Sequence, residues 1–130
     1  MTEQSQLLDA VQWDDKNLVP CITQCHQSGR ILMMAWMNRE SILATIDQQQ
    51  MVYWSRSRKR LWHKGESSGH FQLLKQLQID CDGDCLLAIV EQIGDIACHT
   101  GTNSCFFREY RDGELNVIEQ PLKDEKDIYS

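Results

Sequence analysis

The sequence predicts a strand-rich α+β fold, and three observations lead to this prediction. Residues 73–79 alternate in the manner of a half-buried strand. Residues 18–25, 31–37 and 85–93 form mainly apolar runs of strand length. Residues 39–48 instead carry apolar side chains at helical spacing, so a helix interrupts the strands. We therefore expect a sheet as the main layer, accompanied by few helices.

Length and composition indicate a single globular domain. The 130 residues are enough for one domain, 1–130, with a core of about residues 18–107, a polar N-terminal lead-in and an acidic C-terminal tail. No apolar run approaches the roughly 20 residues that span a bilayer. The polar, acidic N-terminus is not typical of a signal peptide, so we expect a cytoplasmic protein. Its six cysteines are then thiols or metal ligands rather than disulfides.

The first third of the chain predicts a lead-in and a hairpin. Residues 1–16 have a few apolar side chains at helical spacing and form either a short helix or a loosely packed lead-in. Residues 18–25 predict a strand that Pro20 restricts to a sheet edge or to the start of the strand. Residues 31–37 predict a second strand, buried on both faces, which pairs with the first.

A helix follows this hairpin. Asn38 is a good N-cap, and Glu40 in the first turn suits the positive end of the helix dipole, so the helix should cover residues 39–48. The apolar residues expected on one face of it are Ile42, Leu43 and Ile46. Residues 51–55 then predict another strand.

Residues 55–70, called the basic segment below, favour ligand binding over regular structure. The segment holds five of the 13 basic residues of a chain whose net charge is −6. Such a compact patch suits a small anion better than a nucleic acid, which usually meets a broad basic face. Its glycines and serines, with guanidinium groups nearby, predict a phosphate cradle. A solvated basic loop is the alternative, but Trp54 and Trp62 bracket the cluster and favour the cradle.

Asp80, Asp82 and Asp84 predict a site for a hard cation. They lie in the connection between the strands 73–79 and 85–93, where Gly83 permits a left-handed turn. If alternate residues point the same way, the three carboxylates converge on one ion while Cys81 points elsewhere. Magnesium or calcium prefers such oxygen ligands. A polar turn with spare acids is the alternative.

The cysteines predict a second metal. Cys98 and Cys105, together with either Cys81 or Cys85, give three thiolates, the number expected of a catalytic zinc that keeps one position open. His99 follows Cys98 directly and could move a proton. The alternative is that these thiols are merely buried, and this alternative is favoured for Cys21 and Cys25. Farther on, we expect a turn at residues 111–114 and a frayed tail at 119–130.

Taken together, these segments show that the chain resembles the phosphoribosyl-AMP cyclohydrolase family over roughly residues 18–107. Four blocks carry the resemblance, in the family's order: MMAWMNRES at 33–41, YWSRSRKRLWHKGESSGH at 53–70, DCDGD at 80–84, and CHTG with SC at 98–105. The chain resembles the stand-alone form of this enzyme.

The resemblance implies a mixed, mostly β pseudo-barrel with flanking helices, assembled as an intertwined homodimer. It implies that Cys81, Cys98 and Cys105 bind Zn²⁺, with Cys81 supplied across the subunit interface, and that Asp80, Asp82 and Asp84 bind Mg²⁺. His99 is the catalytic candidate. The substrate-binding candidates are Arg56, Arg58, Arg60, Lys64, Glu66, Ser67, Ser68 and His70.

The implied reaction is a step of histidine biosynthesis that opens the adenine ring of N1-(5-phosphoribosyl)-AMP at the N1–C6 bond and gives the formimino-carboxamide ribonucleotide. The partner is thus a small phosphorylated nucleotide, with no nucleic acid and no membrane. Zinc would make hydroxide available at neutral pH for attack on a weakly electrophilic carbon. A zinc base deaminase is a competing interpretation, but the chain lacks the H-x-E and P-C-x-x-C motifs of that class. A second competing interpretation is a structural zinc module that binds an acidic partner.

Overall fold

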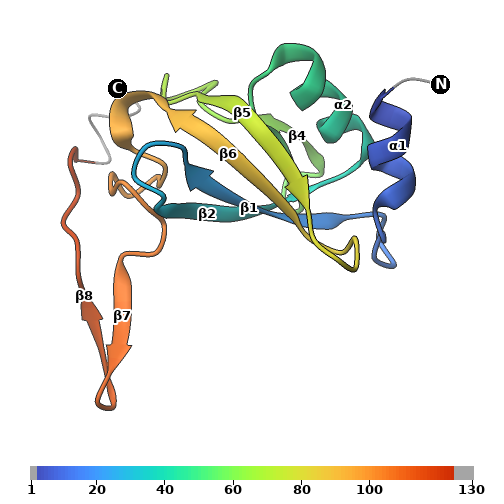
Figure 1. Cartoon of the computed structure of the whole chain (residues 1–130). Helices are drawn as coiled ribbons and strands as arrows, with labels where there is room; N and C mark the ends of the chain where they lie inside the picture. The colour runs from blue at the N-terminus through green and yellow to red at the C-terminus, as the bar shows by residue number, and fades with distance from the viewer. Residues whose placement is uncertain (1–2, 125–130) are drawn as a thin grey trace.

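The computed structural model describes residues 3–124, in which one curled sheet is flanked by two α-helices and followed by a separate hairpin (Figure 1). The elements in chain order are α1 (Glu3–Ala10), β1 (Val19–Cys25), β2 (Ile31–Met37), α2 (Arg39–Gln48), β3 (Val52–Ser55), β4 (Arg60–His63), β5 (Gln72–Ile79), β6 (Leu86–Gln92), the short 3₁₀ helix η1 (Ile93–Asp95), β7 (Arg108–Arg111) and β8 (Glu114–Val117).

The main sheet is mixed and partly closed. Its strand order is β4-β3-β2-β1-β6-β5, and all neighbours are antiparallel except β1 and β6. The two ends of the sheet approach each other because an antiparallel bridge joins Gln50, just before β3, to Leu73 in β5. The Met51 N–H also donates to the Gln72 carbonyl over 2.9 Å. The predicted strand-rich α+β class is thus confirmed, in the form of a curled half-barrel.

The helix α2 has the predicted bounds and cap. The Asn38 side chain accepts the Ser41 N–H over 2.8 Å, and the Ser41 hydroxyl oxygen accepts the Asn38 N–H in return. The buried face consists of Ser41, Ile42 and Thr45. Leu43 is 42% exposed, so the predicted grouping of Leu43 with Ile42 was wrong. The hydroxyl of Thr45 contacts the backbone of Val52, which fixes the helix against β3.

The β1–β2 hairpin is confirmed, but two details of it differ from expectation. Pro20 is the second residue of β1, as predicted, yet β1 lies inside the sheet and not at its edge. One residue is extra in β2: Thr23 faces Met33 and Gln24 faces Ile31. This bulge changes which side chains point inward, and Met34 is 46% exposed. The expected burial of β2 on both faces was therefore wrong for this chain alone.

Residues 3–10 form a helix, one of the two alternatives left open for residues 1–16. Two other segments differ from expectation. The basic segment, expected to be irregular, contains the strand β4, paired with β3. Beyond the main sheet, β7 and β8 form a hairpin around the predicted turn and project from the body (Figure 1). The tail is held where it is described, because Leu122 N–H donates to the Gly101 carbonyl over 2.8 Å. Residues 125–130 of the predicted tail lie outside the described residues.

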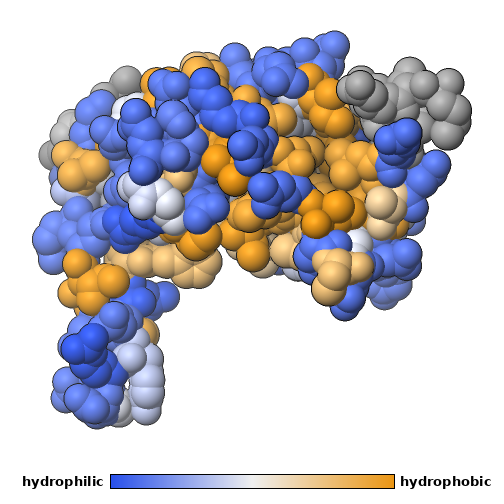
Figure 2. Space-filling view, in the orientation of Figure 1, coloured by the Kyte–Doolittle hydropathy of each residue, from blue (hydrophilic) through white to orange (hydrophobic). Residues whose placement is uncertain are grey.

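The core lies between the sheet and the helices and is built mainly from β1, β2, β3 and β6. Its fully buried members include Val19, Leu32, Ile42, Tyr53 and Leu86. In the view of Figure 2, hydrophobic surface gathers over the central strands and beside the helices, while the far end of the projecting hairpin is largely hydrophilic. None of the helices described in residues 3–124 has the length and apolar character that crossing a membrane requires.

Candidate active site

A pocket of about 720 Å³ brings most of the predicted substrate-binding residues together with His99. It is lined by Ser55, Ser57, Arg58, Arg60, Trp62, Lys64, Gly65, Glu66, Ser67, Ser68 and His99. The basic segment thus meets the residue that follows Cys98, although 30 or more positions separate them in the sequence. Arg58, Arg60 and His99 are exposed, so their polar groups are available to a ligand.

The shape of the basic segment follows from one hairpin and one glycine. Strands β3 and β4 pair from Val52–His63 to Ser55–Arg60, so residues 56–59 form the turn that presents the arginines. Gly65 then adopts a positive φ of 96°, and a Cβ there would lie 2.6 Å from the Phe71 nitrogen. Only glycine suits this position. The Gly69 N–H donates to the Gly65 carbonyl over 2.7 Å, which closes the loop that carries Glu66, Ser67 and Ser68.

Lys64 ties this segment to the cysteines. It is only 8% exposed, and its Nζ donates to the Ala97 carbonyl over 2.5 Å and lies 5.1 Å from the centre of the Trp62 ring. Burial lowers the pKa of the Lys64 ammonium, and the charges of Cys105 and Cys98 offset only part of this shift. The Lys64 side chain therefore lies near the two cysteines as well as in the basic segment.

Two predicted residues do not line this pocket. Arg56 lies over Trp36, 4.7 Å from the ring centre, and lines a second pocket beside the first. His70 is 8% exposed, and its ring packs so closely against Gly94 that a Cβ there would overlap it. Burial lowers the pKa of His70, and the charges of Lys123 and Lys64 lower it further.

Cys98 and Cys105 form a thiol pair. Their side chains hydrogen-bond to each other, and the Thr100 hydroxyl donates to the Cys98 sulfur over 3.1 Å. Burial raises the pKa of Cys98, but hydrogen bonds from Thr100, Thr102 and Cys105 more than offset it, and the pKa is lowered overall. The pKa of Cys105 is raised to about 12 by loss of solvation and by the neighbouring Cys98 charge. A thiol of lowered pKa beside a second thiol is a donor pair of the kind that zinc suits.

Residues 97–105, called the cysteine loop below, are held from two sides. The bulge in β2 frees the Leu32 carbonyl, which accepts the Cys105 N–H over 2.7 Å. The Ser104 hydroxyl donates to the Ile31 carbonyl over 2.7 Å. From the other side, Glu119 forms an ion pair with Arg30 and accepts the Ser104 N–H over 3.4 Å. The role of Glu119 was not anticipated, because an isolated acid in a polar tail carries no signal.

The acidic residues lie on a turn and not on extended chain. Residues 80–85, called the acidic turn below, join β5 to β6, and Gly83 has the predicted positive φ, 76°. The Asp84 N–H donates to Asp80 Oδ1 over 3.1 Å, and the hydrogen bond and charge of Asp80 raise the pKa of Asp84. The Cys81 thiol donates to Asp82 Oδ1 over 3.2 Å. Cys81 does not point away from the acids, because the side-chain alternation of a strand does not hold in a turn.

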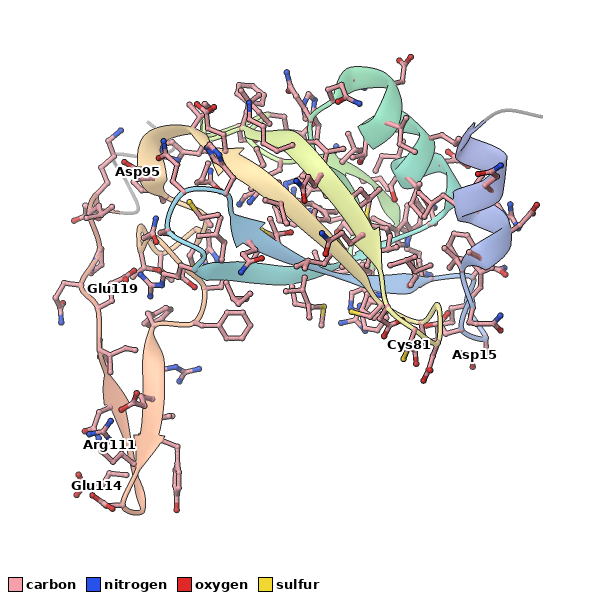
Figure 3. All side chains as sticks on the ribbon, in the orientation of Figure 1. Asp15, Cys81, Asp95, Arg111, Glu114 and Glu119 are labelled. Carbon is pink, nitrogen blue, oxygen red and sulfur yellow. The ribbon has the colours of Figure 1, made fainter. Side chains whose placement is uncertain are left out.

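The acidic turn and the thiol pair lie at opposite ends of the sheet. Figure 3 shows Cys81 at one end and Asp95, three residues before Cys98, at the other. The seven residues of β6 separate them, a length of roughly 20 Å. Cys85 lies at the same end as Cys81, where its charge acts on the buried Cys21. In residues 3–124 of a single chain, no three His, Cys, Asp or Glu side chains converge as metal ligands.

Comparison with known proteins gives consistent matches. Residues 33–107 match the family model described as phosphoribosyl-AMP cyclohydrolase. The chain is 56% identical over 123 residues to phosphoribosyl-AMP cyclohydrolase 1 of Pseudomonas fluorescens, an alignment that covers 95% of each protein. It is 54% identical over 123 residues to the enzyme of that name from Pseudomonas putida, again with 95% of each protein covered. The phosphoribosyl-AMP cyclohydrolase of Azoarcus sp. is 53% identical over 131 residues, with both proteins covered completely.

Proposed function

Because the chain belongs to the phosphoribosyl-AMP cyclohydrolase family, we propose that it hydrolyses the N1–C6 bond of the adenine in N1-(5-phosphoribosyl)-AMP, a step of histidine biosynthesis. Water adds its oxygen to C6, the N1–C6 bond breaks, and N1 takes up a proton. The single product carries a carboxamide at C6 and a formimino group that contains N1. Six free thiols fit the cytoplasm as the site of this reaction.

The observation that carries the proposal is the composition of the first pocket. Arginines, serines and backbone amides suit phosphate oxygens, and His99 reaches the same space from the cysteine loop. A volume of about 720 Å³ suits a nucleotide-sized ligand. We assign phosphate binding to Arg58, Arg60, Ser67 and Ser68.

We assign proton transfer to His99. An imidazole can give and take protons at neutral pH, and this one lines the pocket where the purine would lie. In this role it donates to N1 as the ring opens. Lys64 holds the basic segment against the backbone of Ala97 and thereby keeps His99 and the phosphate-binding residues together.

The thiol pair would hold Zn²⁺ together with Cys81 of a second subunit. Cys98 and Cys105 already adjoin, and the distance along β6 keeps the Cys81 of the same chain away. When bound, zinc supplies a Lewis acid that activates water for attack at neutral pH. The side chains of Asp80, Asp82 and Asp84 in the acidic turn do not converge on one point in the single chain, so they would have to turn toward one ion to hold Mg²⁺, which would offset phosphate charge. The working protein is then an intertwined homodimer with two such sites.

Turnover of N1-(5-phosphoribosyl)-AMP by the purified protein with zinc and magnesium tests the proposal. We expect the ultraviolet spectrum to change as the purine ring opens. His99→Asn should lower kcat by about 10²- to 10⁴-fold, the usual contribution of a general acid, with little change in KM. His26→Asn, a change at an exposed histidine outside the pocket, is the control. Release of ammonia from AMP, without ring opening, would contradict the proposal and favour a deaminase.

A further inference from the structure

The second pocket beside the candidate active site is unusual for its aromatic lining and its lone cation. It has a volume of about 570 Å³, and its lining includes Trp36, Trp54, Trp62 and Arg56. Trp36 and Trp54 face each other directly across β2 and β3. Their rings offer a flat surface of the kind on which sugars and bases pack.

The two pockets adjoin. Ser55, Ser57 and Trp62 line both of them, so one ligand can extend from one pocket into the other over these side chains. The turn at residues 56–59 sends neighbouring arginines to different sides: Arg58 lines the first pocket and Arg56 the second.

Arg56 and Arg58 are both available to anions. Within residues 3–124, neither guanidinium has a carboxylate at ion-pair distance, whereas Arg60 is 3.4 Å from Glu66. Arg56 is instead held over Trp36, 4.7 Å from its ring centre, which fixes the guanidinium without neutralising its charge. A held, uncompensated arginine is suited to a phosphate group.

We propose that the second pocket is a separate anion subsite that takes one phosphoribosyl arm of the substrate. This inference rests on the proposed function, in which the substrate carries two phosphoribosyl groups on one purine. The purine and one arm occupy the first pocket, where His99 lies and Arg58 binds that arm's phosphate. The other arm crosses Ser57, its ribose packs on Trp54, and its phosphate meets Arg56, which Trp36 holds in place.

Two unreactive probes, AMP and ribose 5-phosphate, test this division in the intact protein, with tryptophan fluorescence as the readout. AMP carries the base and one arm, so it should fill the first pocket and leave the second open. We expect ribose 5-phosphate to bind to protein already saturated with AMP. Arg56→Met should weaken this second binding about 10-fold or more, the worth of a charge-assisted hydrogen bond, and leave AMP affinity unchanged. Arg58→Met should weaken AMP binding instead.

Two further variants separate the subsite from general damage. Trp36→Leu should weaken the binding of ribose 5-phosphate and not that of AMP, because it removes the ring that holds Arg56 and leaves the first pocket intact. Arg39→Met is the matched control, since Arg39 lies over Trp13 outside both pockets. Strict competition between AMP and ribose 5-phosphate would overturn the proposal, as would equal loss of AMP affinity in Arg56→Met and Arg58→Met. Either result is separate from the turnover assay, so the subsite can fail while the proposed function stands.

Discussion

At the scale of single residues, burial separates members of the basic segment that residue type alone would group together. Lys64 and His70 stand in the same basic segment as the exposed Arg58, yet both are buried. Ala97 lies against Lys64 and Gly94 against His70, at separations of 33 and 24 residues in the sequence. Neither Ala97 nor Gly94 carries a signal in the sequence, so the burial of Lys64 and His70 could not be predicted.

The burial of His70 predicts a pH-dependent stability. Burial first, and then two lysine charges, lower the folded-state pKa below the unfolded value of about 6.5. Between the two pKa values the unfolded chain binds the extra proton, so stability rises with pH there. The contribution is fully present above the unfolded pKa and is lost as pH falls below it.

Urea unfolding at pH 7.5 and 5.5 measures this effect. His70→Phe keeps a ring against Gly94 but cannot be protonated, so its stability should fall less between these pH values than that of the wild type. The stability of His26→Gln, a change at an exposed position, should fall between these pH values as much as that of the wild type does. An equal fall in His70→Phe and the wild type would show that His70 does not contribute.

At the scale of elements, regular segments were predictable and those that depend on a distant contact were not. The helix α2 and the strands β5 and β6 follow from local period and capping. The strand β4 was missed because its side chains, exposed or half-buried, lack an apolar period. The bulge in β2, which presents the Leu32 carbonyl to Cys105, arises from the pairing with β1 and has no local mark.

The acidic turn depends on such a contact, and Gly83 tests it. Gly83 has a φ of 76°, and a Cβ there would lie far inside van der Waals contact with the Ala10 carbonyl at the end of α1. Gly83→Ala should therefore destabilise the protein by about 2 kcal/mol or more, from backbone strain and overpacking together. The free energy of urea unfolding measures this cost.

Gly113→Ala is the matched control. Gly113 has a φ of 84° but nothing within 4 Å of the added Cβ, so only the backbone cost of about 1 kcal/mol applies. Equal costs at the two positions would mean that the packing of the acidic turn against α1 contributes nothing.

At the scale of the whole molecule, the main finding is that one chain keeps Cys81 at the opposite end of the sheet from Cys98 and Cys105. The sequence indicated which cysteines could bind zinc, but residue types alone could not say that one chain keeps them apart. The described chain also leaves apolar side chains on its surface, among them Ile31 and Phe106, at exposures of 37% and 54%. Phe106 directly follows the cysteine loop in the sequence, and the carbonyl of Ile31 accepts a hydrogen bond from Ser104 of that loop. In the proposed homodimer, a second copy would lie against this region, cover these side chains and supply its Cys81 to the thiol pair.

The proposed assembly would couple zinc binding to dimerisation. A metal held by two subunits binds the dimer and not the separated chains, so removing zinc with a chelator should weaken the dimer. Cys85→Ser should keep both zinc and activity, because Cys85 is assigned no ligand role. Loss of zinc in Cys85→Ser but not in Cys81→Ser would contradict the ligand assignment.

The most direct measurement mixes two inactive variants, Cys81→Ser and Cys98→Ser, and follows both zinc content and turnover. In the heterodimer, one site lacks both replaced ligands and the other site has all three cysteines. Activity and zinc should return on mixing, up to about half of the wild-type value per heterodimer if the two sites act independently. If the subunits exchange, as a tagged chain would show, and neither zinc nor activity returns, then the site is not shared between subunits.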